Sequence, residues 1–265
     1  MVGRVVAGVV VAVCASVLAV SARADAPANV FDGAGVFVDN TANYPGPWQL
    51  ADELQAAHFS WVALHVHNDT HEIGIDPLWV SVLRDHGLKV GGWGSEGSDV
   101  LADAVNASDE IRDNRLDFYI ADAETSFEQT KKLHFWRNSA AFVTWFRRFQ
   151  PTIPAALTTY GAAPAPWVIP IDYAAWRNGG FDLLPQAYYN QFPKVLRPDM
   201  TVAHAVRAGW TLPQVHPVIG VYRRYPAANY VPLLQGLGTE GFSVFIGDQA
   251  TAADYSALSP LVDGS

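Results

Sequence analysis

The sequence predicts a single (β/α)8 barrel. Short runs of β-branched and aromatic residues alternate eight times with longer amphipathic runs, and about 230 residues hold all eight units, which suits this fold. The alternative is a doubly wound open sheet, but no glycine-rich phosphate loop follows the first expected strand. Because no long linker, charge run or shift in composition divides the chain, we expect one domain over residues 28–262.

The expected elements follow one another in regular order. The eight strands are expected at Gly35–Asn40, Ser60–Asn68, Lys89–Trp93, Asp117–Glu124, Ala155–Tyr160, Phe181–Tyr189, His216–Tyr222 and Phe242–Gly247. The helices are expected at Pro47–His58, Pro77–His86, Asp99–Ile111, Phe135–Phe149, Tyr173–Trp176, Thr201–Ala208, Asn229–Leu237 and Ala252–Leu258. Asp76 before Pro77 is typical of a helix start, and Gly87 of a helix end.

The first 24 residues have the pattern of a secretory signal peptide. Arg4 gives a basic start, Val5–Val20 is an apolar run, and Ala22-Arg23-Ala24 matches a cleavage site between small residues. An uncleaved membrane anchor is the alternative, but the run is shorter than the roughly 20 apolar residues that cross a bilayer. We expect cleavage after Ala24 and a secreted protein, extracellular or associated with the cell wall, without membrane contact after cleavage.

Charge and cysteine content narrow the function classes. The chain has 26 acidic residues against 17 basic ones, and cleavage would leave 15 basic residues and remove Cys14, the single cysteine. An acidic surface argues against a nucleic-acid partner, whose phosphates need a basic face. Without a thiol, the mature chain offers no disulfide, thiolate metal site or cysteine nucleophile. We expect a monomer that needs no cofactor and no bound metal.

The carboxyl ends of the expected strands are rich in acids and aromatic rings. In a (β/α)8 barrel these ends form the functional face. They carry Asp39, Asn40, His65, His67, Asp69, Trp93, Glu96, Asp122, Glu124, Tyr160, Gln186, Tyr188, Tyr222, Arg223 and Asp248. Aromatic rings that stack on sugar rings, beside carboxylates that move protons, favour a carbohydrate site. Trp167 offers a further ring of this kind.

Asp122 and Glu124 are the sharpest local feature. Side chains alternate along a strand, so both carboxylates point to one face, with Phe118 and Ile120 continuing that face into the barrel. Mutual repulsion and a partly apolar setting should raise one of the two pKa values. Glu124 lies farther out and is the better general acid, and Asp122 is its electrostatic partner. The alternative is a solvated acidic pair that ends a strand or caps the next helix.

This strand resembles the D-x-x-D-x-D-x-E strand of glycoside hydrolase family 18 chitinases. Asp117, Asp122 and Glu124 match three of its acidic positions, and Ile120 stands at the fourth. The run Leu88-Lys89-Val90-Gly91-Gly92-Trp93 resembles the family's glycine-rich third strand, and Gln186-Ala187-Tyr188-Tyr189-Asn190 its sixth. The Asp122-x-Glu124 pair is also similar to the D-x-E of family 25 lysozymes, which cleave peptidoglycan.

The resemblance to family 18 implies a role for each matching residue. Glu124 would be the general acid, Asp122 would orient the N-acetyl group of the substrate, and Tyr188 would hydrogen-bond that group, in a reaction assisted by the substrate itself. We expect substrate contacts from Asp39, His67, Trp93, Tyr160, Gln186, Tyr188, Tyr222 and Asp248. Arg223 is a further candidate, for an acidic sugar substituent.

The leading hypothesis is therefore a glycosidase that acts on a polysaccharide with N-acetylated sugars, chitin-like or peptidoglycan. A non-catalytic carbohydrate-binding or cell-surface barrel is the alternative, motivated by Ile120 in place of an acid. A metal-dependent hydrolase is a third possibility, because His65-Val66-His67 would place two imidazoles on one strand face.

Overall fold

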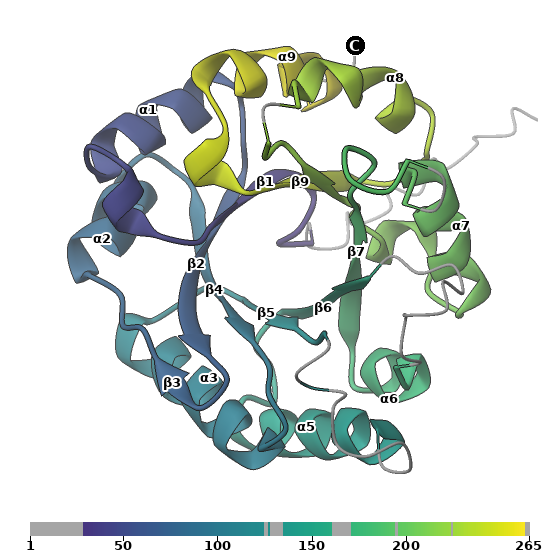
Figure 1. Cartoon of the computed structure of the whole chain (residues 1–265). Coiled ribbons are helices and arrows are strands. Elements are labelled where there is room, and N and C mark those ends of the chain that lie inside the picture. The colour runs from purple at the N-terminus through teal and green to yellow at the C-terminus, as the bar shows by residue number, and fades with distance from the viewer. Residues whose placement is uncertain are drawn as a thin grey trace, which may run out of the picture.

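All eight expected strands form and close into a parallel barrel. The computed structural model describes residues 29–124, 127, 135–160, 171–193, 196–223 and 225–262, so the expected signal peptide and Trp167 lie outside the described residues. Figure 1 shows the strands as an inner ring with the helices packed around it. Parallel pairing runs around the ring, and β1 closes it by pairing with both β2 and β9. The single (β/α)8 barrel is confirmed.

The bounds of most elements agree with the expected ones to within a few residues. The strands are β1 Gly33–Val38, β2 Trp61–Asn68, β3 His71–Glu72, β4 Lys89–Ser95, β5 Tyr119–Asp122, β6 Ala155–Tyr160, β7 Phe181–Ala187, β8 Val218–Gly220 and β9 Gly241–Phe245. The helices are α1 Pro47–Ala56, α2 Pro77–Asp85, α3 Val100–Asn114, α5 Phe135–Phe149, α6 Tyr173–Asn178, α7 Pro198–Arg207, α8 Val231–Leu234 and α9 Ala252–Val262. Short 3-10 turns lie at Thr41–Asn43, Leu212–Gln214, Ala227–Asn229 and Gly247–Gln249.

Helix α2 shows how local chemistry sets these bounds. The Asp76 carboxylate accepts a hydrogen bond from the backbone N–H of Leu78 at 2.9 Å, and Pro77 occupies the first turn, where its missing N–H costs nothing. Gly87 follows the helix with φ 83°, a left-handed conformation that glycine adopts without strain. Among the described residues, no helix combines the length and apolarity needed to cross a bilayer.

Three elements differ from expectation: α8 and β8, which are shortened near prolines, and β3, which was not expected. The expected helix at Asn229–Leu237 is reduced to α8, which starts just before Pro232 and is followed by Gly236 at φ 78°. Strand β8 starts only after Pro217, which has no N–H for the sheet. The sequence also gave no indication of β3, a two-residue strand that folds back antiparallel on β2 through a turn with Asp69 at φ 53°.

Apolar side chains fill two separate layers. Ile120 on β5 and Phe118 just before it point into the barrel, whereas Tyr119 and Ala121 point outward to the helices. The interior layer comprises Phe31, Phe37, Trp61, Ala63, Trp93, Phe118, Ile120, Ala156, Leu184 and Val218, all buried. These side chains fill the barrel, so the functional surface lies above them, at the carboxyl ends of the strands.

One buried acid on α3 predicts a pH dependence of stability. Glu110 is 8% exposed and accepts a hydrogen bond from the Asn114 amide at 2.7 Å. Burial, followed by the charges of Glu72 and Asp113, raises its pKa to about 7. The folded state therefore holds this proton to higher pH than the unfolded state, and its stability falls as pH rises from about 4.5 to 7.

Glu110→Gln should remove this loss. We expect the variant to exceed the wild type in free energy of unfolding by about 1–2 kcal/mol at pH 8, after allowing for partial solvent screening, and to match it at pH 4. Urea unfolding at both pH values measures the difference. Glu240→Gln, at an exposed position, serves as the matched control and should leave the pH dependence unchanged. An equal effect at pH 4 and pH 8 would contradict the assignment.

Candidate functional site

Asp122 and Glu124 converge at the mouth of the barrel. Strand β5 alternates, so Asp122 stands above buried Ile120 on the inner face. The Gln186 side-chain amide, on β7, donates to Glu124 Oε1 at 2.5 Å and lies 3.3 Å from Asp122 Oδ1. One donor therefore touches both carboxylates and holds them at a common point.

The pair is arranged to retain a proton. Burial, and then the charge of Glu124, raise the pKa of Asp122 well above its usual range, and a hydrogen bond with Ser95 lowers it in part. Asp122 therefore keeps its proton to a higher pH than an ordinary aspartate does, which leaves one proton beside the two carboxyl groups toward neutral pH. Ser95 was not identified as a site residue from the sequence; it is paired with Asp122 in the β4–β5 register.

Aromatic rings form one side of this mouth. Tyr188 stacks on Phe245 with ring centroids 5.6 Å apart and meets Tyr222 edge-on at 5.6 Å. Burial, followed by the charges of Asp122 and Glu124, raises the pKa of Tyr188 well above its usual range, so its hydroxyl stays a donor. Tyr222 donates to Gln191 at 2.5 Å, a contact that the sequence did not predict.

Asp39 and Asp248 belong to a second acidic group at the same end of the barrel. Asp39 is exposed and lies 2.8 Å from His65 Nδ1, and Asn43 donates to Asp248 at 2.6 Å. Burial raises the pKa of Asp248, and the charge of Asp39 adds to the shift. A cleft beside this group is lined by Asp39, Asn40, Thr41, Leu64, His65, Ile73, Gly74 and Ile75.

Trp93 does not offer a free face to a sugar, which corrects the sequence expectation. Its ring is 3% exposed and is covered by the His65 imidazole, with centroids 3.8 Å apart and planes 9° apart. Its indole N–H donates to the Val38 carbonyl at 3.0 Å. Trp93 points inward, as β4 alternation dictates, and packs inside the barrel against Phe37 and Phe245 instead of lining the mouth.

His67 does not lie at the mouth, where a substrate contact was expected from the sequence, because β2 has a bulge. The register with β4 slips between His65 and His67, so the extra residue, Val66, shares the outer face with His67. His65 faces the mouth, whereas His67 is fully buried behind the barrel wall, with Nε2 2.7 Å from the Tyr119 hydroxyl. The two imidazoles therefore do not share a strand face, and the metal-dependent hydrolase built on them is wrong in its geometry.

Three other residues named at the expected strand ends, Tyr160, Arg223 and Glu96, have different surroundings. Tyr160 ends β6 in register with Gln186, and it borders a cavity that Tyr173 and His204 also line. Arg223 follows Tyr222 with φ 59°, and its guanidinium lies 5.9 Å from that ring. Glu96 lies fully buried after the last residue of β4, and its Oε1 accepts from Tyr119 on the outer face of the barrel. It is therefore absent from the mouth.

The structure thus brings five side chains together and separates others. Asp122, Glu124, Gln186, Tyr188 and Tyr222 form one group. Asp39 and Asp248 accompany His65 and Asn43 in the second, whereas His67, Glu96 and Trp93 are withdrawn from solvent. The geometry offers one proton-holding carboxyl pair, an amide that positions it and a hydroxyl beside it, which suits acid catalysis on a sugar.

Known proteins resemble this chain in structure but not detectably in sequence. No family model and no curated protein matches it. The C-terminal domain of a putative chitinase from Desulfitobacterium hafniense matches with a TM-score of 0.66 at 10% identity, over 88% of this chain and 99% of that one. A family GH18 chitinase from Cycas revoluta, solved with allosamidin, matches with a TM-score of 0.65 at 10% identity, over 88% of this chain and 100% of that one. A GH18 chitinase from Pseudoalteromonas aurantia matches with a TM-score of 0.56 at 13% identity, over 84% of this chain and 97% of that one.

These likenesses lie far below the identity at which activity transfers between proteins, so they establish architecture alone. The resemblance to family 25 lysozymes stays a prediction. The expected resemblance to family 18 is confirmed at the level of structure: this chain has the (β/α)8 fold that family 18 chitinases have.

Proposed function

We propose that this chain is a glycoside hydrolase that cleaves a polysaccharide containing N-acetylated sugars, with Glu124 as general acid. One observation carries the proposal: a single Gln186 amide contacts Asp122 and Glu124 together at the carboxyl ends of the strands. A fold shared with chitinases supports the substrate class, because those proteins place their chemistry on the same scaffold.

The proposed mechanism assigns one task to each group. Glu124 protonates the glycosidic oxygen of the leaving sugar, and the N-acetyl oxygen of the substrate attacks the anomeric carbon in place of a protein nucleophile. Asp122 accepts a hydrogen bond from the N-acetyl N–H and so directs that attack, while the Tyr188 hydroxyl donates to the N-acetyl oxygen. Water then opens the ring intermediate with Glu124 as base, which restores its proton.

Product analysis on the wild-type chain tests the proposal. The protein is incubated with N-acetylglucosamine oligomers and, separately, with peptidoglycan, and new reducing ends are followed by mass spectrometry. We expect release from at least one of the two, with retention of anomeric configuration by NMR, because two displacements occur at the anomeric carbon. If no reducing ends are released from either of the two polymers, the proposal is wrong.

A second candidate is a barrel that binds carbohydrate without cleaving it. Ile120 is fully buried directly below the pair, at the position where the chitinase motif carries an aspartate, so Asp122 has no acidic partner beneath it. Calorimetry distinguishes the candidates: sugar binding that is unchanged by Glu124→Gln and accompanied by no product supports the binding protein.

Gln186 supplies a quantitative test of the arrangement. Gln186→Leu removes the amide that holds the two carboxylates together, and we expect kcat to fall by about 10–100-fold, the effect of losing a hydrogen bond to a charged group. Gln235→Leu, at an exposed position after α8 and before the amino end of β9, is the matched control. Equal kcat values for the two variants would show that the amide is not part of the machinery.

We also propose that the enzyme works outside the cell, on the basis of the export pattern in residues 1–24. N-terminal sequencing of the protein from culture medium should begin at Asp25. Protein retained in the cell with Met1 intact would argue against export.

A further inference from the structure

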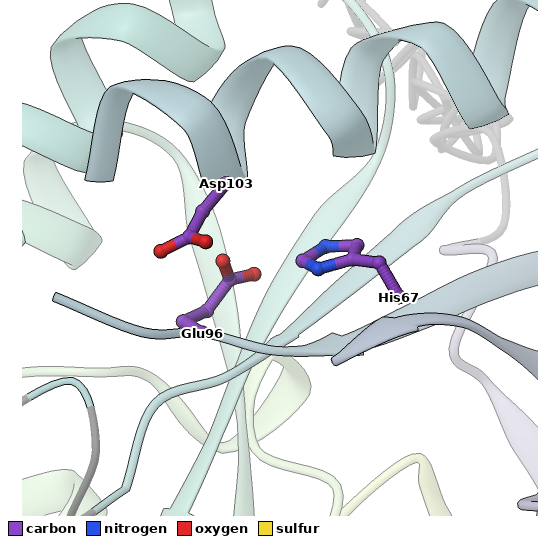
Figure 2. Close-up of side chains that lie close together, drawn as sticks. All are labelled: His67, Glu96 and Asp103. Atoms are coloured by element: carbon purple, nitrogen blue, oxygen red, sulfur yellow. The ribbon is translucent and has the colours of Figure 1, made fainter. Parts of the chain in front are cut away.

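A buried polar cluster lies between the barrel wall and α3, on the opposite side of β4 from the catalytic pair. It contains His67 from β2, Glu96 from the segment after β4, and Asp103 from the first turn of α3, none of which is exposed. A donor atom from each of the three lies within 4.8 Å of the others. Figure 2 shows the imidazole and the two carboxylates turned toward one another.

The backbone is shaped to make room for this cluster. The β2 bulge turns His67 outward, and Gly94 lies opposite it in the β2–β4 register. A Cβ at Gly94 would come within 2.2 Å of His67 Nε2, so only glycine admits the ring. The backbone N–H of Gly97 donates to Asp103 Oδ2 at 2.9 Å and fixes the carboxylate in the cluster.

Hydrogen bonds determine which ring nitrogen of His67 carries the proton. His67 Nδ1 lies 3.0 Å from the carbonyl of Asp69, which only accepts, so Nδ1 carries the proton and Nε2 presents a lone pair. This is the outer contact that orients metal-bound histidines. The Tyr119 hydroxyl lies 2.7 Å from both His67 Nε2 and Glu96 Oε1, and because it donates its single proton to Glu96, the Nε2 lone pair receives no hydrogen bond from it.

One carboxylate oxygen in the cluster lacks a partner. Within the part of the chain that the structure describes, Asp103 Oδ1 is buried and makes no hydrogen bond. An acceptor of this kind is costly to bury unless something binds it. The acidic surroundings increase the cost, because Asp69 and Asp99 add negative charge near Asp103.

We propose that His67, Glu96 and Asp103 bind one divalent transition-metal ion of the zinc type, as a structural site that joins α3 to β2 and β4. The charge balances, since two carboxylates and a neutral imidazole match a dication. Tetrahedral zinc ligands lie about 3.4 Å apart, so three donors within 4.8 Å of one another need to close by at most about 1.4 Å. An imidazole ligand disfavours calcium and magnesium, which take oxygen ligands.

The proposed ion site does not rest on the proposed glycosidase activity. It lies on the outer face of the barrel wall, whereas Glu124 and Gln186 lie at the mouth, and the charge of Asp122 is close enough to act on Glu96. The tests below therefore measure metal binding and stability without an activity assay.

Metal content and refolding give the first test. The full chain is purified from zinc-supplemented culture without chelator, and its zinc is counted by mass spectrometry; one equivalent per chain is expected. The chain is then unfolded with chelator and refolded with or without ZnCl2. Zinc at about a hundredfold excess over its Kd should raise Tm by about 5–10 °C. A zinc-free protein whose Tm does not respond to ZnCl2 would overturn the proposal.

Matched variants localise the ion. His67→Gln and Asp103→Asn should each lower zinc affinity at least tenfold, whereas Asp109→Asn, the same change on the exposed face of α3, should leave it intact. Equal zinc content in Asp103→Asn and Asp109→Asn would place the ion elsewhere. If the buried variants do not fold, the wild-type chain refolded with cobalt(II) gives a second test. Visible d–d bands of a four- or five-coordinate ion support the site, and their absence refutes it.

Discussion

Replacing Glu124 by glutamine will lower kcat for N-acetylated glycan hydrolysis by about 10²–10⁴-fold and leave the fold intact. Glutamine keeps the shape of the side chain but has no proton to give the leaving oxygen, and general acid catalysis is worth about this factor. Glu124 is held by one amide and is not part of the packed core, so its loss removes chemistry without opening a cavity.

Initial rates on an N-acetylglucosamine oligomer measure the effect, with thermal unfolding as the check on folding. Glu240→Gln is the matched control: the same substitution at an exposed position just before β9, at the end of the barrel remote from the mouth. It should keep wild-type kcat. If Glu124→Gln retains full hydrolysis, the general acid has been assigned to the wrong residue.

Replacing Trp61 by alanine will lower the free energy of unfolding by about 3–5 kcal/mol, a large part of the stability of a typical domain. Trp61 is fully buried inside the barrel and meets Phe31, Phe37 and Phe118 edge-on at centroid distances of 5.8, 5.9 and 5.4 Å. Alanine would leave a cavity among these rings, and the strands around it restrict collapse.

Urea unfolding measures this loss, and Trp48→Ala is the matched control. Trp48 lies on α1 and is 53% exposed, so the same truncation there should change stability by no more than about 0.5 kcal/mol. Similar losses in the two variants would mean that the barrel interior contributes less packing energy than its burial implies.

Local patterns were sufficient for the order and the bounds of most elements. Strand β6 and helix α5 have the expected bounds, Ala155–Tyr160 and Phe135–Phe149. An apolar run predicts a buried strand and an amphipathic run predicts a helix with one buried face, and both patterns are visible in the local sequence. The pairing of Asp122 with Glu124 on one face also followed from the two-residue period of a strand.

The same period failed on β2, and the reason is tertiary. In the bulge, two residues of β2 lie opposite one residue of β4, so every later side chain of β2 faces the other side of the sheet. The residues His65-Val66-His67 themselves contain no pattern that predicts the bulge. A signal did exist on another strand: Gly94 is small because His67 lies against it. Reading that signal requires knowing which strands are neighbours.

The sequence by itself determined the eight-unit barrel, the strand that ends at Asp122 two residues before Glu124, and the acidic, aromatic character of the strand ends, since all of these depend on residues close together in the chain. Only the tertiary structure decided that Gln186 holds the two carboxylates, that His65 covers Trp93, and that His67, Glu96 and Asp103 meet behind the barrel. These contacts join side chains from different strands, and their geometry depends on sheet register and a single bulge, which no local period encodes.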